Sequence, residues 1–390
     1  MIKTSTGLIR MKNKKLKIAI VHDWLVTYAG AEKVLECIIE LYPDADLYSL
    51  IEDLDEDNKD FLKNKKVNTT FMQKIPLIKK IYRKLLPIMP FAVETLDLGK
   101  YDLIISSSHA VAKGVITGPM QLHICYCHTP IRYAWDLESE YLYEAGLSQG
   151  IKYFLAKHLL KKIRMWDFIS SSRVDYFISN SNFIGKRINK FYRKNSNTIY
   201  PPVDIDRFKN SFKKEDYYFT FSRFVSYKKI DLIAKTFSKY FPDKKLLIAG
   251  DGPDKNKIKS YENNNIKILG YLSQEELLKY LGGAKAFIFA AYEDFGIVNV
   301  EAQAAGTPVI AYGKGGGSET VIGIDKKNPT GLLFYEQNCE SIRDAIIDFE
   351  DNIELFQQEN MIKNANNFSK EVFKDSLSSF ISSKVIGLKE

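Results

Sequence analysis

The sequence predicts an α/β protein with two doubly wound domains, each built on a parallel β-sheet with helices on both faces. Short apolar runs rich in branched residues alternate with helical patterns, which is typical of parallel sheets because their strands are buried on both sides. The alternation stops and then begins again after residue 216. A proline pair, Pro201 and Pro202, lies between the two series.

The first series starts with the strand-like run KIAIVHD (17–23), followed by a turn that ends at Gly30. AEKVLECIIELY (31–42) then places apolar residues at helical spacing. We assign residues 1–15 to an N-terminal extension and residues 16–200 to the first domain. Further strand-like runs follow at ADLYSLI (45–51), YDLIISSS (101–108), LHICYCH (122–128) and YFISNS (176–181).

The second series starts with the strand-like run YYFTFS (217–222). We assign residues 201–366 to this domain, because the proline pair interrupts regular strand pairing. Residues 367–390 are predicted to form a C-terminal helix, and a crossing of this helix back to the first domain stays open. The elements of the second series are IDLIAKTFSKYF (230–241), KLLIAG (245–250), IKILG (266–270), SQEELLKYL (273–281), AKAFIFA (284–290), GIVNVEAQAAG (296–306) and PVIAY (308–312).

Composition and charge limit the class of protein. The chain has 390 residues, of which 45% are hydrophobic and 27% charged, and these values are typical of a globular protein. The net charge of +8 leaves nucleic acid, an anionic membrane surface and anionic small substrates open as partners, beside a role in solubility alone.

Cysteine usage and hydropathy predict a reduced, cytoplasmic protein. Cys37, Cys125, Cys127 and Cys339 are too few for a disulfide framework and lack further ligands at zinc spacing. The basic stretch 1–15 is not followed by the apolar segment of a signal peptide. No apolar run approaches the roughly 18 residues of a membrane span.

The most informative stretch is YEDFGIVNVEAQAAGTPVI (292–310). A helix is expected to begin at Ile297 and to end near Gly306, with Pro308 beyond it. The first N–H groups of a helix have no acceptor within it, so the backbone of Phe295, Gly296, Ile297 and Val298 is predicted to bind an anion.

Two glutamates bracket this helix start. Glu293 lies in the loop before it, and Glu301 lies about one turn inside. At about 1.5 Å per residue the two are up to roughly 12 Å apart along an axis, which is too far to share a proton or one metal ion. We interpret the two glutamates as acceptors for hydroxyl groups at opposite ends of one elongated ligand, whose phosphate binds between them. A nucleotide sugar is a ligand of this kind.

Two shorter motifs follow other strands of the second series. In SRFVSYKK (222–229), Arg223 and Lys228 can converge on one anion, although this stretch alone would also fit a solvated loop. GDGP (250–253) lacks the spacing of known phosphate loops and is predicted to be a structural turn lining the cleft. Ligands of open α/β sheets bind beyond the carboxyl ends of the strands, so we expect the two sheets to face each other across a cleft.

These motifs together resemble the retaining glycosyltransferases with two Rossmann-like domains, the GT-B architecture of glycosyltransferase family 4. The resemblance rests on the linker PPVDIDRF (201–208), SRF-x3-K, GDGP and the Glu293/Glu301 pair, which follow each other in this order along the chain. HDWLVTYAGAEKVL (22–35) and CYCHTPIRYAWD (125–136) further resemble the mannosyltransferase branch that builds bacterial O-antigen and capsule polysaccharide.

The resemblance implies a role for each matching residue of the second domain. Arg223 and Lys228 would grip the donor diphosphate and stabilise the departing nucleotide. Glu293 would touch the transferred sugar, and Glu301 would hold the ribose hydroxyls. Tyr271 and Leu272, which follow the strand at 266–270, would lie against the base.

The resemblance implies fewer roles in the first domain. His128 would lie at the reacting end of the sugar, and Gly30 would let the backbone approach the donor, although Ala29 stands where relatives often carry a second glycine. His22 and His109 fit either a cleft residue or a satisfied polar group. His123 is expected to face the surroundings of the sheet.

No metal and no cofactor are predicted. The Asp-x-Asp motifs DLD (53–55) and DID (204–206) lie in an acidic surface run and in the linker, and the family is mostly metal-independent. Positive charge from Arg223, Lys228 and the helix start can stabilise the leaving diphosphate in place of a metal ion.

Two basic stretches of the first domain suggest contact with a membrane. KIPLIKKIYRK (74–84) and IKYFLAKHLLKKIR (151–164) each hold five basic residues, and basic amphipathic helices can lie on anionic lipid. In the second stretch Ile151, Leu155, Leu159 and Ile163 follow at a spacing of four, a stripe that could equally pack on the domain.

The sequence therefore predicts a retaining, metal-independent transferase at the inner face of the plasma membrane. It would move a hexose, most simply mannose from GDP-mannose, onto a lipid-diphosphate-linked intermediate of a bacterial surface polysaccharide. A UDP-sugar donor, a nucleotide-sugar epimerase of the same fold and a non-enzymatic glycan-binding protein are the alternatives.

Overall fold

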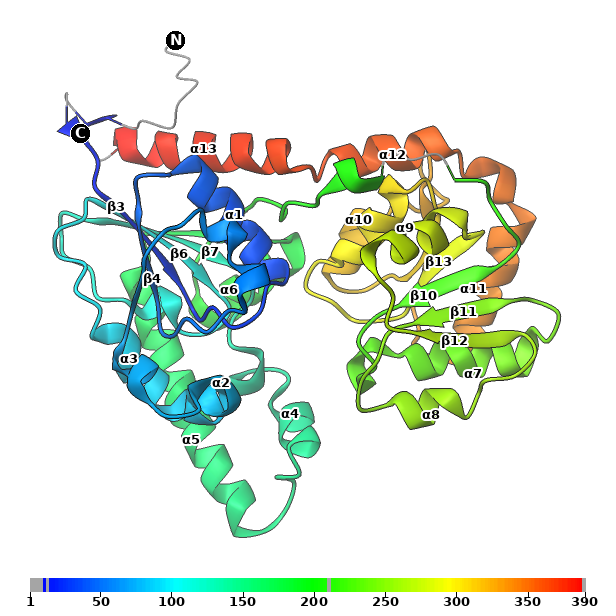
Figure 1. The fold of residues 1–390 in the computed structure, drawn as a ribbon, viewed down its shortest axis with the longest axis horizontal. Helices are drawn as coiled ribbons and strands as arrows, with labels where there is room; N and C mark the ends of the chain where they lie inside the picture. Colours follow the sequence, from blue (N-terminus) through cyan, green and yellow to red (C-terminus); the bar gives the residue numbers. More distant parts are fainter. Residues whose placement is uncertain (1–9, 12–13, 209–211, 388–390) are drawn as a thin grey trace. The chain divides into compact units, whose positions relative to one another are not determined.

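The computed structural model describes residues 10–11, 14–208 and 212–387 and divides into two compact units (Figure 1). The N-terminal unit runs to Pro201 and also includes the chain from Phe373 onward, and the C-terminal unit is Pro202–Val372. Each unit contains one parallel sheet, so the predicted fold class is confirmed. Most of the N-terminal extension lies outside the described residues, and within it β1 (Arg10–Met11) pairs antiparallel with β2 (Lys14–Lys15).

The N-terminal unit has a seven-stranded parallel sheet in the order β5-β4-β3-β6-β7-β8-β9. The central strands β6 and β7 are buried along their whole length, as their apolar runs predict. The sequence did not single out β5 and β9, because VNT and SNT at the two sheet edges have no apolar run. The strands are β3 (Ile18–His22), β4 (Asp46–Ser49), β5 (Val67–Thr69), β6 (Leu103–Ser108), β7 (Leu122–Cys127), β8 (Tyr176–Ser179) and β9 (Ser196–Thr198).

Helices cover both faces of this sheet, because successive side chains of a strand point to opposite sides. Ile20 of β3 packs in one core with α1 and α13, which lie side by side in Figure 1, whereas Val21 packs with α3 on the other face. Cys125 and Cys127 face the same way, as predicted, and pack against α6. The helices are α1 (Gly30–Leu41), α2 (Ile78–Ile81), α3 (Met89–Glu94), α4 (Glu138–Glu144), α5 (Gly150–Ser170), α6 (Asn182–Tyr192) and α13 (Lys370–Gly387).

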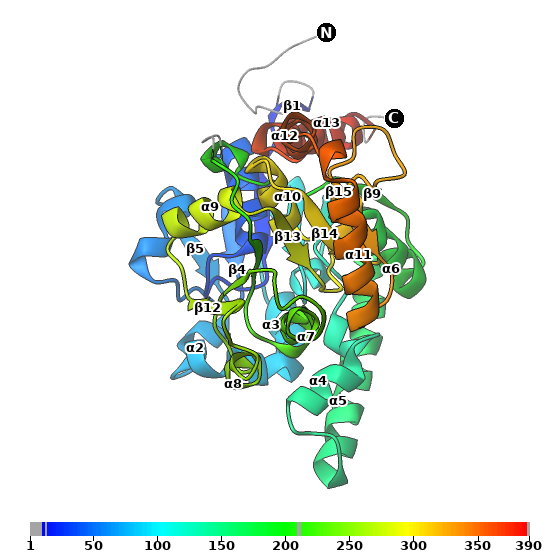
Figure 2. The ribbon, with the colours of Figure 1, turned by 90° about the vertical axis from the view of Figure 1, so that its right-hand side faces the viewer.

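The C-terminal unit has a six-stranded parallel sheet in the order β12-β11-β10-β13-β14-β15. Its strands are β10 (Tyr218–Phe221), β11 (Leu246–Ala249), β12 (Ile266–Gly270), β13 (Ala286–Phe289), β14 (Val309–Tyr312) and β15 (Gly331–Phe334). Its helices, several of which are seen from the side in Figure 2, are α7 (Ile230–Tyr240), α8 (Lys255–Lys259), α9 (Gln274–Gly283), α10 (Ile297–Ala304), α11 (Cys339–Asp351) and α12 (Gln358–Asn366).

Helix α10, which carries the central motif, begins at Ile297 as predicted. Its C-cap is Ala305, one residue before the predicted Gly306. The N–H of Thr307 donates to the carbonyl oxygen of Ala302 and closes the last turn. Helix α10 connects β13 to β14 along the chain, and it starts at the carboxyl end of the sheet.

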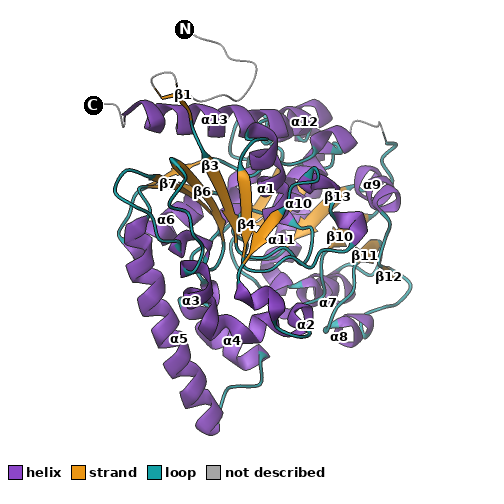
Figure 3. Cartoon of the chain, turned by 60° about the vertical axis from the view of Figure 1, so that its left-hand side comes forward, coloured by secondary structure: helices purple, strands orange, loops and turns teal. Residues whose placement is uncertain are grey.

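In helix α5 the apolar residues that are spaced four apart do not form one straight stripe. Residues four apart on a helix are turned by about 40°, so the stripe winds from solvent into the core: Ile151 is 87% exposed and Ile163 only 4%. The start of α5 extends away from the sheet of its unit (Figure 3). Among the helices that the structure describes, α5 included, none has the length and apolar character needed to cross a bilayer.

Candidate functional site

An ion pair joins two of the predicted site residues at the carboxyl end of the C-terminal sheet. Nζ of Lys228 contacts Oε1 of Glu293. Lys228 lies beyond β10 and Glu293 beyond β13, and these strands are neighbours. Both side chains are largely buried, with 20% and 17% of their surface exposed. Two residues that are far apart in the sequence thus meet at the carboxyl end of the sheet, beyond two neighbouring strands.

The loop that carries Arg223 is held by the GDGP turn. The N–H of Phe224 donates to the carbonyl oxygen of Asp251 at 2.8 Å, and the N–H of Asp254 donates back to the carbonyl oxygen of Phe224 at 3.1 Å. A Cβ at Gly250 would overlap with the carbonyl oxygen of Ser222, so only glycine allows this approach. GDGP is therefore a structural turn, as predicted, and it leaves the side chain of Arg223 exposed.

The start of α10 lies directly after Glu293. Gly296 is its N-cap, and Ile297 and Val298 begin the first turn, whose N–H groups have no acceptor within the helix. Phe295 is buried against Phe368, with ring centroids 5.6 Å apart. This contact anchors the loop that connects Glu293, the partner of Lys228, to the start of α10.

Glu301, Tyr271 and Leu272 lie on other parts of the same unit. Glu301 is the fifth residue of α10 and is partly buried. Tyr271 and Leu272 follow β12, the edge strand, which lies two strands from β10. Tyr271 is 86% exposed. The structure thus places Tyr271 and Leu272 just beyond the carboxyl end of β12, and Glu301 inside α10.

A glycine-rich loop at 313–318 completes this region, and the sequence analysis missed it. The N–H of Gly316 donates to the carbonyl oxygen of Glu293 at 2.8 Å. Nδ2 of Asn299, on α10, donates to the carbonyl oxygen of Gly317 at 3.1 Å. The loop therefore supports both the Glu293 segment and α10. Its signal was the run GKGGGS directly after the strand PVIAY.

The N-terminal unit holds Gly30 and His128. Gly30 is the first residue of α1, and the carboxylate of Glu32 caps the helix by accepting from the N–H of Ala29 at 2.9 Å. His128 follows β7, and its Nε2 lies 2.8 Å from Oγ of Ser107. Burial, with smaller contributions from the charges of His109 and His22, holds the pKa of His128 well below its usual value.

Two further histidines of this unit, His22 and His123, lie on opposite faces of the sheet. His22 hydrogen-bonds to Ser107 and joins the His128 cluster, whereas His123 is fully buried beside Ser106 on the opposite face. Burial lowers the pKa of His123 to about 4. His123 therefore has a structural partner, and His22 is linked to His128 through Ser107.

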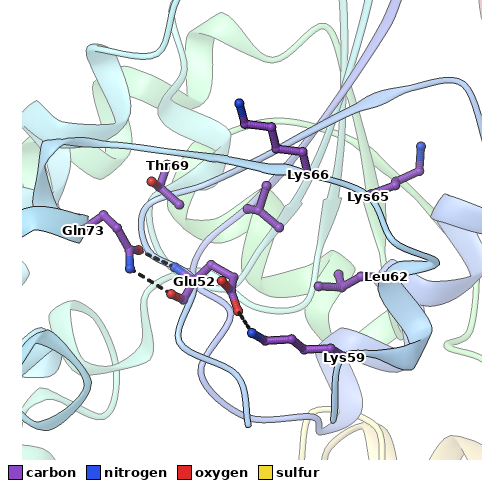
Figure 4. A pocket seen from close by; sticks show the side chains of 8 residues that line it. Glu52, Lys59, Leu62, Lys65, Lys66, Thr69 and Gln73 are labelled. Atoms are coloured by element: carbon purple, nitrogen blue, oxygen red, sulfur yellow. Dashed lines mark hydrogen bonds and ion pairs between the residues drawn. The ribbon is translucent and has the colours of Figure 1, made fainter. Parts of the chain in front are cut away.

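A cavity of about 380 Å³ lies elsewhere on the N-terminal unit (Figure 4). Its polar lining is largely engaged: Lys59 pairs with Glu52, Gln73 hydrogen-bonds to the backbone of Glu52, and Lys65 donates to two backbone carbonyl oxygens. None of the predicted site residues lines it, and we assign no function to it.

Comparison with known protein families gives a match within the C-terminal unit. Residues 203–368 match the model of the family described as glycosyl transferases group 1. The C-terminal unit is similar to this family over that stretch, which is less than half of the chain. This match covers the whole stretch from the linker to the end of α12, and with it all predicted site residues except Gly30 and His128.

Solved structures share the fold of the whole chain, which is of the GT-B type. HepE from Anabaena, solved in complex with UDP, superposes with a TM-score of 0.66 over 94% of this chain and 100% of its own, at 16% identity. The lipopolysaccharide outer core galactosyltransferase WaaB gives a TM-score of 0.66 over 95% and 100%, also at 16% identity.

Curated relatives match only in part. A GDP-mannose-dependent phosphatidylinositol monomannoside mannosyltransferase from Corynebacterium glutamicum is 32% identical over 28% of this chain and 30% of its own length. The alpha-1,3/1,6-mannosyltransferase ALG2 from Saccharomyces cerevisiae is 29% identical over 45% and 47%. The matches thus span less than half the length of these relatives.

Proposed function

We propose that this chain is a retaining, metal-independent glycosyltransferase that transfers a hexose from a nucleotide sugar. The observation that carries the proposal is the ion pair between Lys228 and Glu293, which lies just before the start of α10. Both residues lie in the stretch that matches the group 1 glycosyltransferases. A cation, a carboxylate and the first N–H groups of a helix, together at the carboxyl end of one sheet, suit a ligand that combines a diphosphate with sugar hydroxyls.

The proposed reaction separates charge, and the site stabilises the negative charge that develops. The bond between the sugar and the diphosphate breaks, and the acceptor oxygen bonds to the same sugar carbon. The sugar ring becomes positive, while Arg223, Lys228 and the α10 start stabilise the negative diphosphate. The proton of the acceptor hydroxyl passes to the leaving diphosphate, which serves as the base.

The remaining site residues keep the roles that the resemblance implies. Glu293 contacts the transferred sugar, Glu301 holds the ribose hydroxyls, and Tyr271 and Leu272 lie against the base. We further propose that His128 acts at the reacting end of the sugar.

The proposed donor is GDP-mannose, and the proposed acceptor is a lipid-linked intermediate of a bacterial surface polysaccharide. The names of the mannosyltransferase relatives support this donor. The UDP in the HepE complex favours a UDP-sugar as the second candidate. A panel of GDP-mannose, UDP-glucose and UDP-N-acetylglucosamine separates the two. We expect hydrolysis or transfer with GDP-mannose, and turnover of a UDP-sugar alone would contradict the mannose assignment.

Removal of metal ions is expected to leave the rate unchanged. Two aspartates of the Asp-x-Asp motifs are engaged by lysines, Asp55 by Lys79 at 2.6 Å and Asp204 by Lys370 at 3.7 Å, and the cationic groups at the site can take the role of a metal. The measurement is the transfer rate with EDTA, compared with EDTA plus excess Mg²⁺. A loss of activity that Mg²⁺ restores would contradict metal independence.

We also propose that the N-terminal unit docks on an anionic membrane at the inner face of the plasma membrane through one face of α5. Apolar residues at both ends of this face are exposed: Ile151 by 87%, Phe154 by 71%, Phe168 by 47% and Ile169 by 57%. Lys161 and Lys162 lie between them and are exposed. Basic residues contribute about 1 kcal/mol each near anionic lipid, so the combination suits a bilayer surface better than water.

The double variant Ile151→Glu/Phe154→Glu is expected to reduce binding to vesicles of phosphatidylglycerol at least about tenfold. Burying each of these side chains in lipid is worth roughly 1.5–3 kcal/mol, and the added carboxylates repel the anionic surface. Vesicle co-sedimentation gives the bound fraction. Ile347→Glu, which changes an exposed apolar residue of α11 (43%), is the control. Equal binding by both variants would exclude α5 as the docking face.

A further inference from the structure

Two partly exposed tyrosine rings lie against the glycine-rich loop 313–318 of the C-terminal unit. Tyr335 directly follows β15 and is 56% exposed, and Tyr292 lies shortly after β13 and is 42% exposed. A Cβ at Gly313 would meet Cε1 of Tyr335 at 2.6 Å, and a Cβ at Gly315 would meet the ring of Tyr292 at 3.1 Å. The missing side chains of these two glycines thus leave the room in which the rings lie.

Buried aromatic side chains support these rings from the core of the unit. The ring of Tyr312 lies 6.2 Å from that of Tyr292 at an angle of 69°, and 5.8 Å from the ring of Phe334, the residue before Tyr335. Aromatic contacts at such distances favour a defined ring orientation. A tyrosine also has only two side-chain torsions, so little conformational entropy is lost when its exposed side binds a ligand.

Two charged side chains flank the rings. Lys314 lies between the two glycines of the loop, and Glu336 follows Tyr335 in the chain. Nζ of Lys314 lies 4.0 Å from Oε1 of Glu336, and the two side chains are 52% and 71% exposed. An exposed pair of this kind contributes little to stability, and its ammonium and carboxylate can still donate to and accept from another molecule. The surface therefore combines aromatic rings with a hydrogen-bond donor and an acceptor.

A sugar ring matches both kinds of group. The C–H groups of a pyranose form an apolar face that packs on an aromatic ring, whereas its hydroxyls lie around the edge and both donate and accept. A nucleobase also stacks on aromatic rings, but Tyr271 and Leu272, which are proposed to lie against the base, follow β12. Strands β12 and β15 are the two opposite edges of the sheet. Carbohydrate is therefore the class of ligand that this surface suits.

The spacing of the two rings points to more than one sugar unit. Tyr292 follows β13 and Tyr335 follows β15, with β14 between these strands. Neighbouring strands lie about 4.8 Å apart, so two spacings amount to roughly 10 Å. A single hexose ring is shorter than this, whereas two linked units span it. Tyr292 also directly precedes Glu293, which is proposed to contact the transferred sugar.

We propose that Tyr292 and Tyr335, together with Lys314 and Glu336, form a subsite that binds sugar units of the growing glycan. The assignment of these sugar units to the acceptor rests on the proposed function. The binding of carbohydrate rests on the surface itself, and it can be measured without any transfer reaction.

The test compares the binding of soluble sugars by variants of the full chain. Mannotriose, maltotriose and N-acetylchitotriose are the carbohydrate probes, GDP and UDP are the nucleotide probes, and saturation-transfer NMR gives the dissociation constants. Tyr335→Ala should weaken the trisaccharide that binds best at least about fivefold, the scale of aromatic contacts beyond the area that they bury. Nucleotide binding should stay unchanged. Tyr335→Phe keeps the ring and should bind the trisaccharide nearly as the wild type does.

Two further variants separate a role in binding from a role in folding. Gly313→Ala keeps the ring but displaces it, because the added Cβ would overlap with the ring edge, so we expect an intermediate loss of trisaccharide binding. Tyr143→Ala removes an exposed tyrosine of α4 (77%) and is the control without effect. Since its side chain is more than half exposed, Tyr335→Ala should keep a melting temperature near that of the wild type.

Hydrolysis of the nucleotide sugar that the donor panel selects separates the glycan from the transferred hexose. We expect Tyr335→Ala to leave the KM of this hydrolysis unchanged, because the transferred hexose contacts Glu293 and the ring of Tyr335 binds a more distant unit. A rise in this KM would place the ring on the transferred hexose and contradict a subsite for the glycan.

The binding results distinguish failure of the subsite from failure of the proposed function. Absence of binding of all three trisaccharides to the wild type, or equal binding by the wild type and Tyr335→Ala, overturns the subsite. Weaker nucleotide binding by Tyr335→Ala, with unchanged trisaccharide binding, would make the ring a platform for the base instead. Trisaccharide binding that depends on Tyr335, in a chain that turns over no donor, overturns the proposed function and leaves the subsite standing.

Discussion

Arg223→Ala is expected to lower the rate of hexose transfer at least about 100-fold, the usual scale for losing a group that stabilises developing charge. The guanidinium is exposed beyond β10, on a loop held by the GDGP turn, and it can bind two oxygens of a diphosphate at once. Arg223→Lys keeps the charge without the planar fork, so its rate should fall between those of alanine and the wild type.

Lys228→Ala is expected to lose a similar factor in rate, yet to differ from Arg223→Ala in stability. Lys228 is paired with Glu293, and both side chains are largely buried. Removing the lysine leaves a carboxylate without its partner, which is costly in a partly buried place. Arg223 makes no ion pair among the described residues, so Arg223→Ala should keep the wild-type melting temperature.

Initial rates at saturating donor, together with thermal unfolding, measure both effects. Arg343→Ala is the control, because Arg343 lies on α11, where it pairs with Asp344 and lies over the ring of Tyr240. Near-wild-type rates in Arg223→Ala or Lys228→Ala would remove that residue from the diphosphate assignment. A large drop in the melting temperature of Arg223→Ala would mean that the arginine is structural.

The sequence predicted those parts of the fold and site that have a local signal. Buried parallel strands show as apolar runs, and the loop–helix junction at Glu293 and Ile297 shows as a strand, a glycine and a helical pattern. The edge strands β5 and β9 have no such run, and the four-residue stripe of α5 was wrong because it does not follow the helical period.

Contacts between distant segments could not be predicted in the same way. Lys228 and Glu293 meet because β10 and β13 are neighbours in the sheet, and strand order is set by packing of the whole unit. Ser107 and His128 meet for the same reason, on β6 and after β7. The sequence marked His128 as a single residue, and its partners became visible only with the sheet order.

Gly316→Ala is expected to destabilise the C-terminal unit and to weaken donor binding. A Cβ at this position would overlap with the carbonyl oxygen of Asp294 and approach the backbone nitrogen of Phe295 to 2.9 Å. Both neighbours are backbone atoms, which cannot turn away as a flexible side chain would. Overpacking of this kind costs about 1–3 kcal/mol, and its relief requires the Glu293 loop to move.

The movement of that loop links the stability effect to function. The N–H of Gly316 donates to the carbonyl oxygen of Glu293, so a displaced loop shifts the carboxylate that pairs with Lys228 and the residues that precede α10. A shift of about 1 Å at groups that position a substrate can cost 100-fold in rate. We therefore expect Gly316→Ala to lower both the melting temperature and the transfer rate.

Gly317→Ala provides the matched control from the next residue of the same loop. A Cβ there would meet Nδ2 of Asn299 at 3.4 Å and the ring of Phe289 at 3.5 Å, which are ordinary contact distances. Thermal unfolding and donor titration should therefore separate the two variants, with Gly317→Ala close to the wild type. Equal behaviour of both would mean that the loop does not support the Glu293 segment. A loss confined to Gly316→Ala would show that this one backbone contact holds the carboxylate and the start of α10 in the arrangement that the transfer reaction requires.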